Sequence, residues 1–263
     1  MRNFPPERII CLTEETVETL YLLGEQDRIV GVTGYAVRPP VVREEKERIA
    51  AFTSAKIDRI LSLQPDLVLA FSDLQADIAA ELIKSGVAVM AYNQRDIAGI
   101  LAMIRHLGAI VGVGDRAEEL ASSYEKRLND IQIRKKYGDR PRVYFEEWDS
   151  PMITGIKWVS ELVEIAGGQD VFFELSGNAA ATDRIVTSEQ VINASPNIIV
   201  ASWCGKKIRY EAFHEREGWS VVPAIEKQCI HEIKSPLILQ PGPAALTDGL
   251  DKLVQIVDLY NHG

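Results

Sequence analysis

The sequence predicts an α/β fold made of two Rossmann-like lobes, each with a parallel central sheet, joined by one long helix. Residues 58–71 recur as residues 189–202, with every aligned position offset by the same 131 residues (189 − 58 and 196 − 65). Each copy contains a helix opened by an acid, a proline that ends the helix, and a short apolar strand. Helical and strand patterns also alternate along the chain, which is typical of a parallel sheet covered by helices.

A second, shorter sequence repeat supports the division into lobes. Gly24 to Asp27 match Gly167 to Asp170, each after an apolar helical run. Self-similarity on this scale indicates two related lobes rather than a short-period solenoid. Two lobes form a cleft, and clefts between lobes are common places for small ligands.

The first lobe is expected over residues 1–114. Its strands are predicted at 8–12, 29–32, 66–71 and 87–91. Its helices are predicted at 13–23, 56–63, 74–85 and 96–111, with Thr13 as the N-cap of the first.

Residues 115–137 contain neither Pro nor Gly and carry apolar residues at helical spacing. They predict one helix of roughly 34 Å that joins the lobes as a rigid strut. The alternative is a last helix of the first lobe, packed on its own sheet.

The second lobe is expected over residues 138–263. Its strands are predicted at 142–146, 198–201 and 229–233. Its helices are predicted at 157–166, 188–194 and 243–261, and Thr187 with Gln190 forms a capping box before the second.

The amino-acid composition of the chain limits the classes of function that it can have. A hydrophobic content of 46% with 25% charged residues is ordinary for a globular protein. The net charge of −9 disfavours general nucleic-acid binding and an anionic membrane surface. The 3 cysteines are far apart in the sequence, so we expect neither a disulfide framework nor a structural metal site.

The first residues lead directly into a predicted strand. They show no apolar signal-peptide core, and the chain has no run of about 18 apolar residues. Either the protein is cytoplasmic or a leader has been removed, so the location stays open.

The segments 7–40 and 57–71 resemble the class III substrate-binding proteins of ABC importers. That family opens with a strand, a Thr/Ser-rich turn, a helix ending in Leu-Gly, and a Tyr-rich loop with Pro-Pro. This chain carries the Leu-Gly pair at Leu23-Gly24 and a loop with Tyr35 before Pro39-Pro40. Its members bind vitamin B12, haem or ferric siderophores, and this chain is most similar to the corrinoid-binding type. The long helix also matches the strut of that family.

The resemblance implies a function in transport. It implies a monomeric, non-enzymatic solute-binding protein that captures a corrinoid, such as cobalamin or cobinamide, and delivers it to a permease. No intrinsic cofactor is implied. Haem or a ferric siderophore is the alternative ligand within the family, although the acidic Glu146–Glu147 pair disfavours an anionic siderophore.

In the first lobe the resemblance places the aromatic ligand contacts at Tyr35, Phe52 and Phe71. The B12 binder is expected to carry Trp at the last two positions, whereas this chain carries Phe. A corrin face needs flat apolar surface, which Phe also supplies. The alternative for all three residues is ordinary core packing.

In the second lobe the candidate contacts lie in two loops expected at 146–151 and 202–207, after predicted strands. Arg184 aligns near an aromatic contact of the B12 binder. With Lys206 and Lys207 it could meet a phosphate or carboxylate, or be a surface charge. The candidate residues are Glu147, Trp148, Arg184, Trp203, Cys204 and Lys206.

Two residues suggest other chemistry. His231 could be an axial ligand to cobalt or iron, although a hydrogen-bonding role is favoured. Cys204 could be the nucleophile of a cytosolic corrinoid-handling enzyme, but no base accompanies it in the sequence. A sensor or chaperone without a transporter is a third possibility.

Asp58 and Glu189 open the two repeated helices. They align with the acids that form salt bridges to permease arginines in the importer family. The alternative is that each acid only stabilises its helix through the helix dipole.

Overall fold

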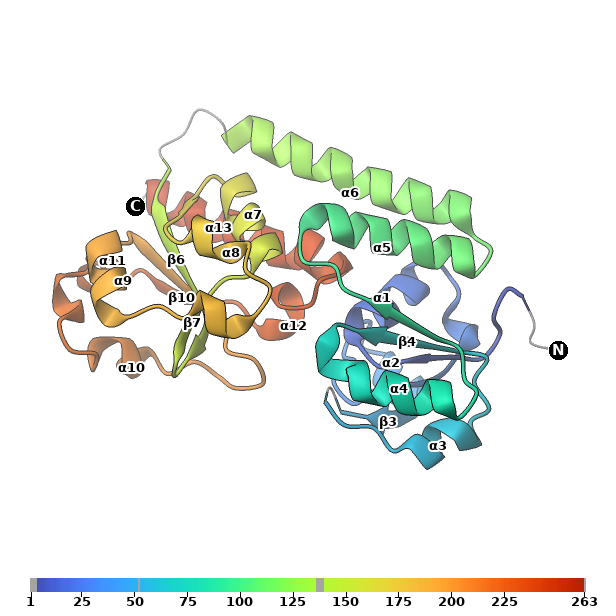
Figure 1. The fold of residues 1–263 in the computed structure, drawn as a ribbon. Coiled ribbons are helices and arrows are strands. Elements are labelled where there is room, and N and C mark those ends of the chain that lie inside the picture. The colour runs from blue at the N-terminus through green and yellow to red at the C-terminus, as the bar shows by residue number, and fades with distance from the viewer. Residues whose placement is uncertain (1–3, 52, 136–139, 263) are drawn as a thin grey trace. The chain divides into compact units, whose positions relative to one another are not determined.

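The computed structural model describes residues 4–51, 53–135 and 140–262. The chain divides into two compact units. Lobe one comprises Met1–Gln94 and Ala98–Ser123, and lobe two comprises Arg95–Ile97 and Tyr124–Gly263. The boundary falls inside the long helix α6 (Gly114–Lys135) (Figure 1). Within the described ranges, no helix is both long enough and apolar enough to cross a membrane.

Lobe one is built on a parallel sheet with the strand order β3-β2-β1-β4-β5. The carboxyl ends of its strands therefore share one edge, the strand-end edge of lobe one. From β1 the chain passes to β2 on one side and later to β4 on the other, so the order reverses beside β1. The strands are β1 (Ile9–Cys11), β2 (Ile29–Thr33), β3 (Arg48–Ala50), β4 (Leu67–Phe71) and β5 (Val89–Tyr92).

Helices cover both faces of this sheet (Figure 1). On one face α1 and α5 are neighbours, and the Thr19 hydroxyl lies 3.9 Å from the Met103 sulfur. On the opposite face Ile60 of α3 and Leu82 of α4 belong to the cluster that contains Ile10 of β1. The helices are α1 (Glu14–Leu22), α2 (Val42–Glu45), α3 (Ile57–Ser62), α4 (Ala76–Lys84) and α5 (Ile97–Ile110).

The predicted long helix is observed as α6, and Tyr137 at its predicted end lies outside the described residues. Its first half packs closely on α5, because a Cβ placed on Gly108 would lie only 2.1 Å from the Cβ of Ala117. Its last residue, Lys135, forms an ion pair with Asp258 in lobe two. The rigidity of this helix as a strut stays a prediction.

Lobe two is built on a sheet with the strand order β10-β9-β6-β7, and β8 also pairs with β6. The strands β10, β9, β6 and β8 run parallel, and β7 runs antiparallel to β6. The strands are β6 (Arg142–Asp149), β7 (Met152–Thr154), β8 (Gln169–Asp170), β9 (Ile198–Ala201) and β10 (Ile230–Glu232).

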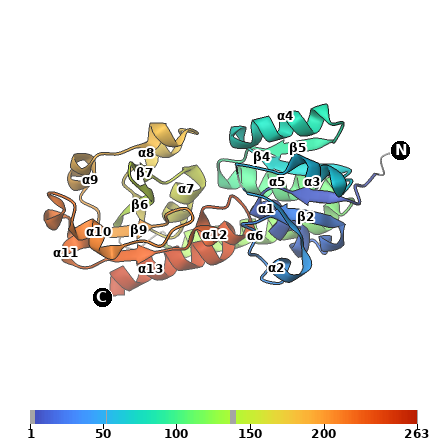
Figure 2. The same ribbon diagram turned by 90° about the horizontal axis from the view of Figure 1, so that it is seen from below.

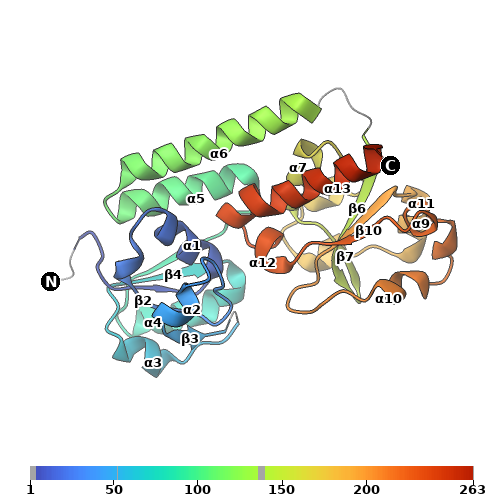
Figure 3. The ribbon, with the colours of Figure 1, turned by 180° about the vertical axis from the view of Figure 1, so that it is seen from behind.

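Helices also cover both faces of the sheet of lobe two. Val163 of α7 and Val143 of β6 meet beside Gly168 on one face. On this side α7 contacts α13, which runs to the end of the described chain (Figures 2 and 3). The helices are α7 (Lys157–Ile165), α8 (Phe173–Ser176), α9 (Ser188–Ala194), α10 (Tyr210–His214), α11 (Pro223–Glu226), α12 (Ser235–Ile238) and α13 (Leu250–His262).

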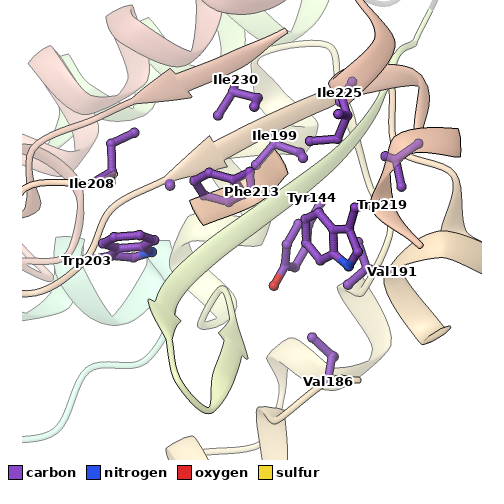
Figure 4. Packing of buried hydrophobic residues seen from close by; sticks show 13 residues of the cluster. Tyr144, Val186, Val191, Ile199, Trp203, Ile208, Phe213, Trp219, Ile225 and Ile230 are labelled. Atoms are coloured by element: carbon purple, nitrogen blue, oxygen red, sulfur yellow. The ribbon is translucent and has the colours of Figure 1, made fainter. Parts of the chain in front are cut away.

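The opposite face of the sheet holds an aromatic core. Tyr144 of β6 meets Trp219 edge to face, with 6.2 Å between ring centroids, and Phe213 lies beside both Trp219 and Trp203 (Figure 4). Aromatic pairs in these geometries contribute beyond their buried area. The cluster therefore anchors α10 and the segment around Trp219 to the sheet.

The internal repeat is confirmed as a structural repeat. One copy forms α3 and β4, and the other forms α9 and β9. In both copies the residue before the proline, Gln64 or Ser195, has a positive φ of 47° or 45°. A left-handed residue followed by proline ends a helix sharply. The helix therefore ends at the equivalent residue in both copies.

One local prediction is wrong, and another is confirmed in position only. The loop expected at 146–151 is a hairpin, because β6 continues to Asp149 and pairs with β7. A tight turn suffices for antiparallel pairing, so the sheet of lobe two is mixed rather than purely parallel. Thr13 occupies the N-cap position of α1, but its hydroxyl donates to Glu15 instead of capping the backbone. The capping box of Thr187 and Gln190 is confirmed.

Candidate functional site

At the strand-end edge of lobe one, a buried side chain connects two strand ends at the point where the strand order reverses. Gln75 is buried there, and its Oε1 accepts from the Phe71 backbone N–H at 2.9 Å. Its Nε2 donates to the Leu12 carbonyl at 3.2 Å. One side chain thereby fixes the ends of β4 and β1 relative to each other. Ligands of open α/β sheets bind at such reversal points.

Two acids follow β1 at this edge. Glu15 is buried, and its carboxyl group accepts a hydrogen bond from the Thr13 hydroxyl at 2.6 Å. Burial raises the pKa of Glu15 to about 8, against the lowering effect of the Thr13 hydrogen bond. Burial also raises the pKa of Glu14 to about 7. Near neutral pH the buried Glu15 carboxyl group therefore stays largely protonated, whereas Glu14 is close to its pKa.

The raised pKa of Glu15 predicts a pH-dependent stability. The folded protein keeps this proton between about pH 4.5 and 8, whereas the unfolded chain loses it, so stability falls as the pH rises through that window. Relative to Glu15→Gln, the wild type should lose about 1–3 kcal/mol of unfolding free energy between pH 5 and 8. Urea unfolding followed by circular dichroism measures this difference.

Glu81→Gln is the matched control, because Glu81 is exposed on α4 of the same lobe. Its pH profile should follow that of the wild type. An identical pH profile for wild type and Glu15→Gln would contradict the buried proton.

The predicted aromatic residues of lobe one differ in exposure. Tyr35 follows β2 and is 52% exposed, so its ring is available to a ligand. Phe71 ends β4 and is only 6% exposed, so most of its ring is core. Phe52 lies outside the described residues. The ligand role of all three stays a prediction.

At the corresponding edge of lobe two, Glu146 is the centre of a buried charge network. The residue is 0% exposed. Arg216 donates to both of its carboxylate oxygens, at 2.6 and 2.9 Å. The Trp203 indole N–H and the Tyr144 hydroxyl also donate to it, each at 3.0 Å. The carboxylate is thereby compensated by one bidentate arginine and two neutral donors.

The other predicted polar contacts of lobe two are also paired. Arg184 is only 2% exposed, and it donates to Glu147 at 2.7 Å and to the Thr154 carbonyl. Lys206 lies 2.6 Å from Asp149 and 4.1 Å above the centre of the Trp148 ring. Of the three basic side chains proposed for a ligand anion, Arg184 and Lys206 therefore already have an acidic partner within lobe two.

Trp203 has a structural role that the sequence did not show. It is 3% exposed and stacks on Phe213 with 5.8 Å between centroids (Figure 4). Trp148 is partly buried and supports Lys206. Of the two, Trp148 is therefore the more accessible, and a ligand contact from either stays a prediction.

Arg216 and Glu146 were not selected from the sequence as site residues. Glu146 belongs to a noted acidic pair, but Arg216 lies in a charged stretch without a motif. Only the pairing of the two side chains identifies them.

The remaining candidates lie apart from this network. Cys204 is exposed just after β9. Lys207 is exposed as well. His231 lies in β10 with its Nε2 3.6 Å from the sulfur of Cys229. Across the described residues, no group of three or more His, Cys, Asp or Glu is arranged to hold a metal ion.

The two predicted docking acids occupy equivalent places. Asp58 lies in the first turn of α3 and Glu189 in the first turn of α9, and both are exposed. Each is therefore free of the core and can serve both the helix dipole and a partner.

Comparison with known proteins places the chain in a family. Residues 9–237 match the family described as periplasmic binding protein, and the chain belongs to that family.

Two relatives of the chain illustrate which proteins it is similar to. An uncharacterised ABC transporter substrate-binding lipoprotein of Bacillus subtilis is 25% identical over 96% of this chain and 80% of the relative. The vitamin B12-binding protein of Vibrio parahaemolyticus is 26% identical over 94% of this chain and 88% of the relative.

A solved structure confirms the fold. The periplasmic heme-binding protein of Roseiflexus sp. RS-1, in its apo form, superposes with a TM-score of 0.80 at 22% identity. The match covers 95% of this chain and 99% of that one. At this identity the likeness speaks for the α/β two-lobed fold.

Proposed function

We propose that the protein is the solute-binding component of an ABC importer and that its cargo is a corrinoid. Membership of the family supports the receptor role. The relative named as a vitamin B12-binding protein, matched over nearly the whole chain, supports the choice of cargo. In this role the protein captures the ligand at the strand-end edges and presents it to a permease.

The observation that carries the corrinoid proposal is the charge of these edges. Lobe one offers Glu14 and Glu15. In lobe two three basic groups at the edge are each neutralised by an acid, in the pairs Arg184–Glu147, Lys206–Asp149 and Arg216–Glu146. A corrinoid presents neutral primary amides, whose N–H groups suit carboxyl acceptors. Haem presents two carboxylates, but at these edges Arg184, Lys206 and Arg216 are already engaged with acids and are less able to bind them.

A matched set of ligands tests the proposal. Cobinamide carries amides where cobyrinic acid carries carboxylates on the same macrocycle, and haem supplies a different carboxylate-bearing ring. We expect cobinamide to bind at least about tenfold more tightly than the other two, a difference of about 1.4 kcal/mol. Quenching of tryptophan fluorescence during titration at pH 7 measures the three affinities.

The comparison between the two corrins isolates charge, because their ring faces are alike. Tighter binding of haem than of cobinamide would overturn the corrinoid proposal and favour the haem alternative. Equal binding of cobinamide and cobyrinic acid would show that the charge of the edges does not select the cargo.

A further inference from the structure

Cys229 and His231 place a thiol and an imidazole side by side in lobe two. Cys229 immediately precedes β10 and His231 is its second residue. Side chains two residues apart in a strand point to the same face. Ile230 between them points the other way, into the aromatic core. The sulfur of Cys229 lies 3.6 Å from Nε2 of His231.

This separation is close to that of two ligands on one zinc ion. Zn–S bonds of about 2.3 Å and Zn–N bonds of about 2.0–2.1 Å at a tetrahedral angle put the two ligand atoms about 3.5 Å apart. The distance between the two ligand atoms therefore already suits a shared metal ion.

The pair is also accessible. β10 is the outer strand in the order β10-β9-β6-β7. Both side chains are half-buried rather than enclosed in the core. A metal ion and its waters can therefore approach from solvent.

We propose that Cys229 and His231 form a binding site for Zn²⁺, with water completing the coordination. A thiolate and an imidazole are ligands that zinc accepts. On binding, the Cys229 thiol releases its proton to solvent and its thiolate bonds to the ion. The neutral imidazole supplies its Nε2 lone pair and keeps its proton on Nδ1. Among the described residues no third His, Cys, Asp or Glu completes the set, so the site is open and exchanges its metal.

Cadmium is the spectroscopic probe for this site, because a thiolate bound to Cd²⁺ absorbs in the ultraviolet. Titration of the full chain with Cd²⁺ should produce this band with one ion per chain, and Zn²⁺ should displace it. Cys229→Ser should abolish the band. His231→Gln should weaken Cd²⁺ binding by at least about tenfold, since even an outer-shell partner of a metal site is worth that much.

Cys204→Ser is the matched control, because Cys204 is the exposed thiol of the same lobe. It should leave the band intact. A band that persists in Cys229→Ser and disappears in Cys204→Ser would overturn the proposal. So would the absence of any band at millimolar Cd²⁺, which would leave a thiol–imidazole hydrogen bond. His231→Gln also removes a proposed ligand while leaving the thiol in place, so it provides the test if Cys229→Ser fails to fold.

Discussion

Replacing Glu146 with glutamine is expected to lower the unfolding free energy of lobe two by about 3–5 kcal/mol. Glu146 is fully buried and neutralises Arg216, whose side chain is 14% exposed. Without the carboxylate, the Arg216 guanidinium stays mostly buried with no compensating charge. The single amide oxygen of glutamine also cannot accept all the hydrogen bonds that the two carboxylate oxygens of Glu146 now accept. Breaking one partner of a buried ion pair costs more than the pair contributes.

Tryptophan fluorescence measures this effect in lobe two specifically. All 4 tryptophans of the chain belong to this lobe, namely Trp148, Trp158, Trp203 and Trp219. The transition recorded during guanidinium unfolding therefore reports lobe two.

The exposed pair Arg209–Glu215 provides the control, because its side chains are both 69% exposed. Glu215→Gln should change stability by less than about 1 kcal/mol. The double variant Glu146→Gln with Arg216→Met removes both charges and should recover part of the loss. A loss in Glu146→Gln no larger than in Glu215→Gln would show that the network does not stabilise the lobe.

Removing Asp58 and Glu189 together is expected to abolish delivery of the cargo while leaving its capture intact. This expectation rests on the proposed importer role. The double variant Asp58→Ala with Glu189→Ala keeps both strand-end edges, so its cobinamide affinity should equal that of the wild type. Each lost acid should cost about 0.3–1 kcal/mol of stability through the helix dipole. Uptake by cells that carry the cognate permease should fall to background, because exposed charges steer association and set its register.

Asp77→Ala with Glu211→Ala is the matched control. Both acids are exposed in the first turn of a helix, one in each lobe. This variant loses the same charge and the same dipole contacts, so its uptake should stay near the wild-type level. Normal uptake by the Asp58/Glu189 variant would leave helix stabilisation as the role of these acids. Equal loss in both double variants would indicate an effect of net charge instead.

Most of the fold was predictable because the sequence patterns that define its helices and strands are local. The acid, the proline and the apolar strand of each repeat lie within 14 consecutive positions, and they define α3–β4 and α9–β9. The capping box of Thr187 also depends on residues only three positions apart. Helix periodicity and breakers act at this range, so the order of elements and the repeat followed from sequence.

The hairpin of β6 and β7 was missed for a physical reason. Its residues are charged and aromatic, and in sequence this composition after a predicted strand indicated a loop. The segment is a strand because β7 supplies hydrogen-bond partners and because charged side chains on it find partners elsewhere in the lobe. Packing context overrides local propensity in strands.

The chain's local pattern was sufficient to establish the α/β class, the two related lobes, the long helix and the matched acids Asp58 and Glu189. The tertiary structure was needed to show which charges are already neutralised. Glu146 and Arg216 are 70 residues apart, and Lys206 and Asp149 are 57 residues apart. Such pairs form only when the order of strands brings their ends together. Sequence spacing carries no record of that order, so Arg184 and Lys206, which looked available to a ligand, proved to be paired inside lobe two.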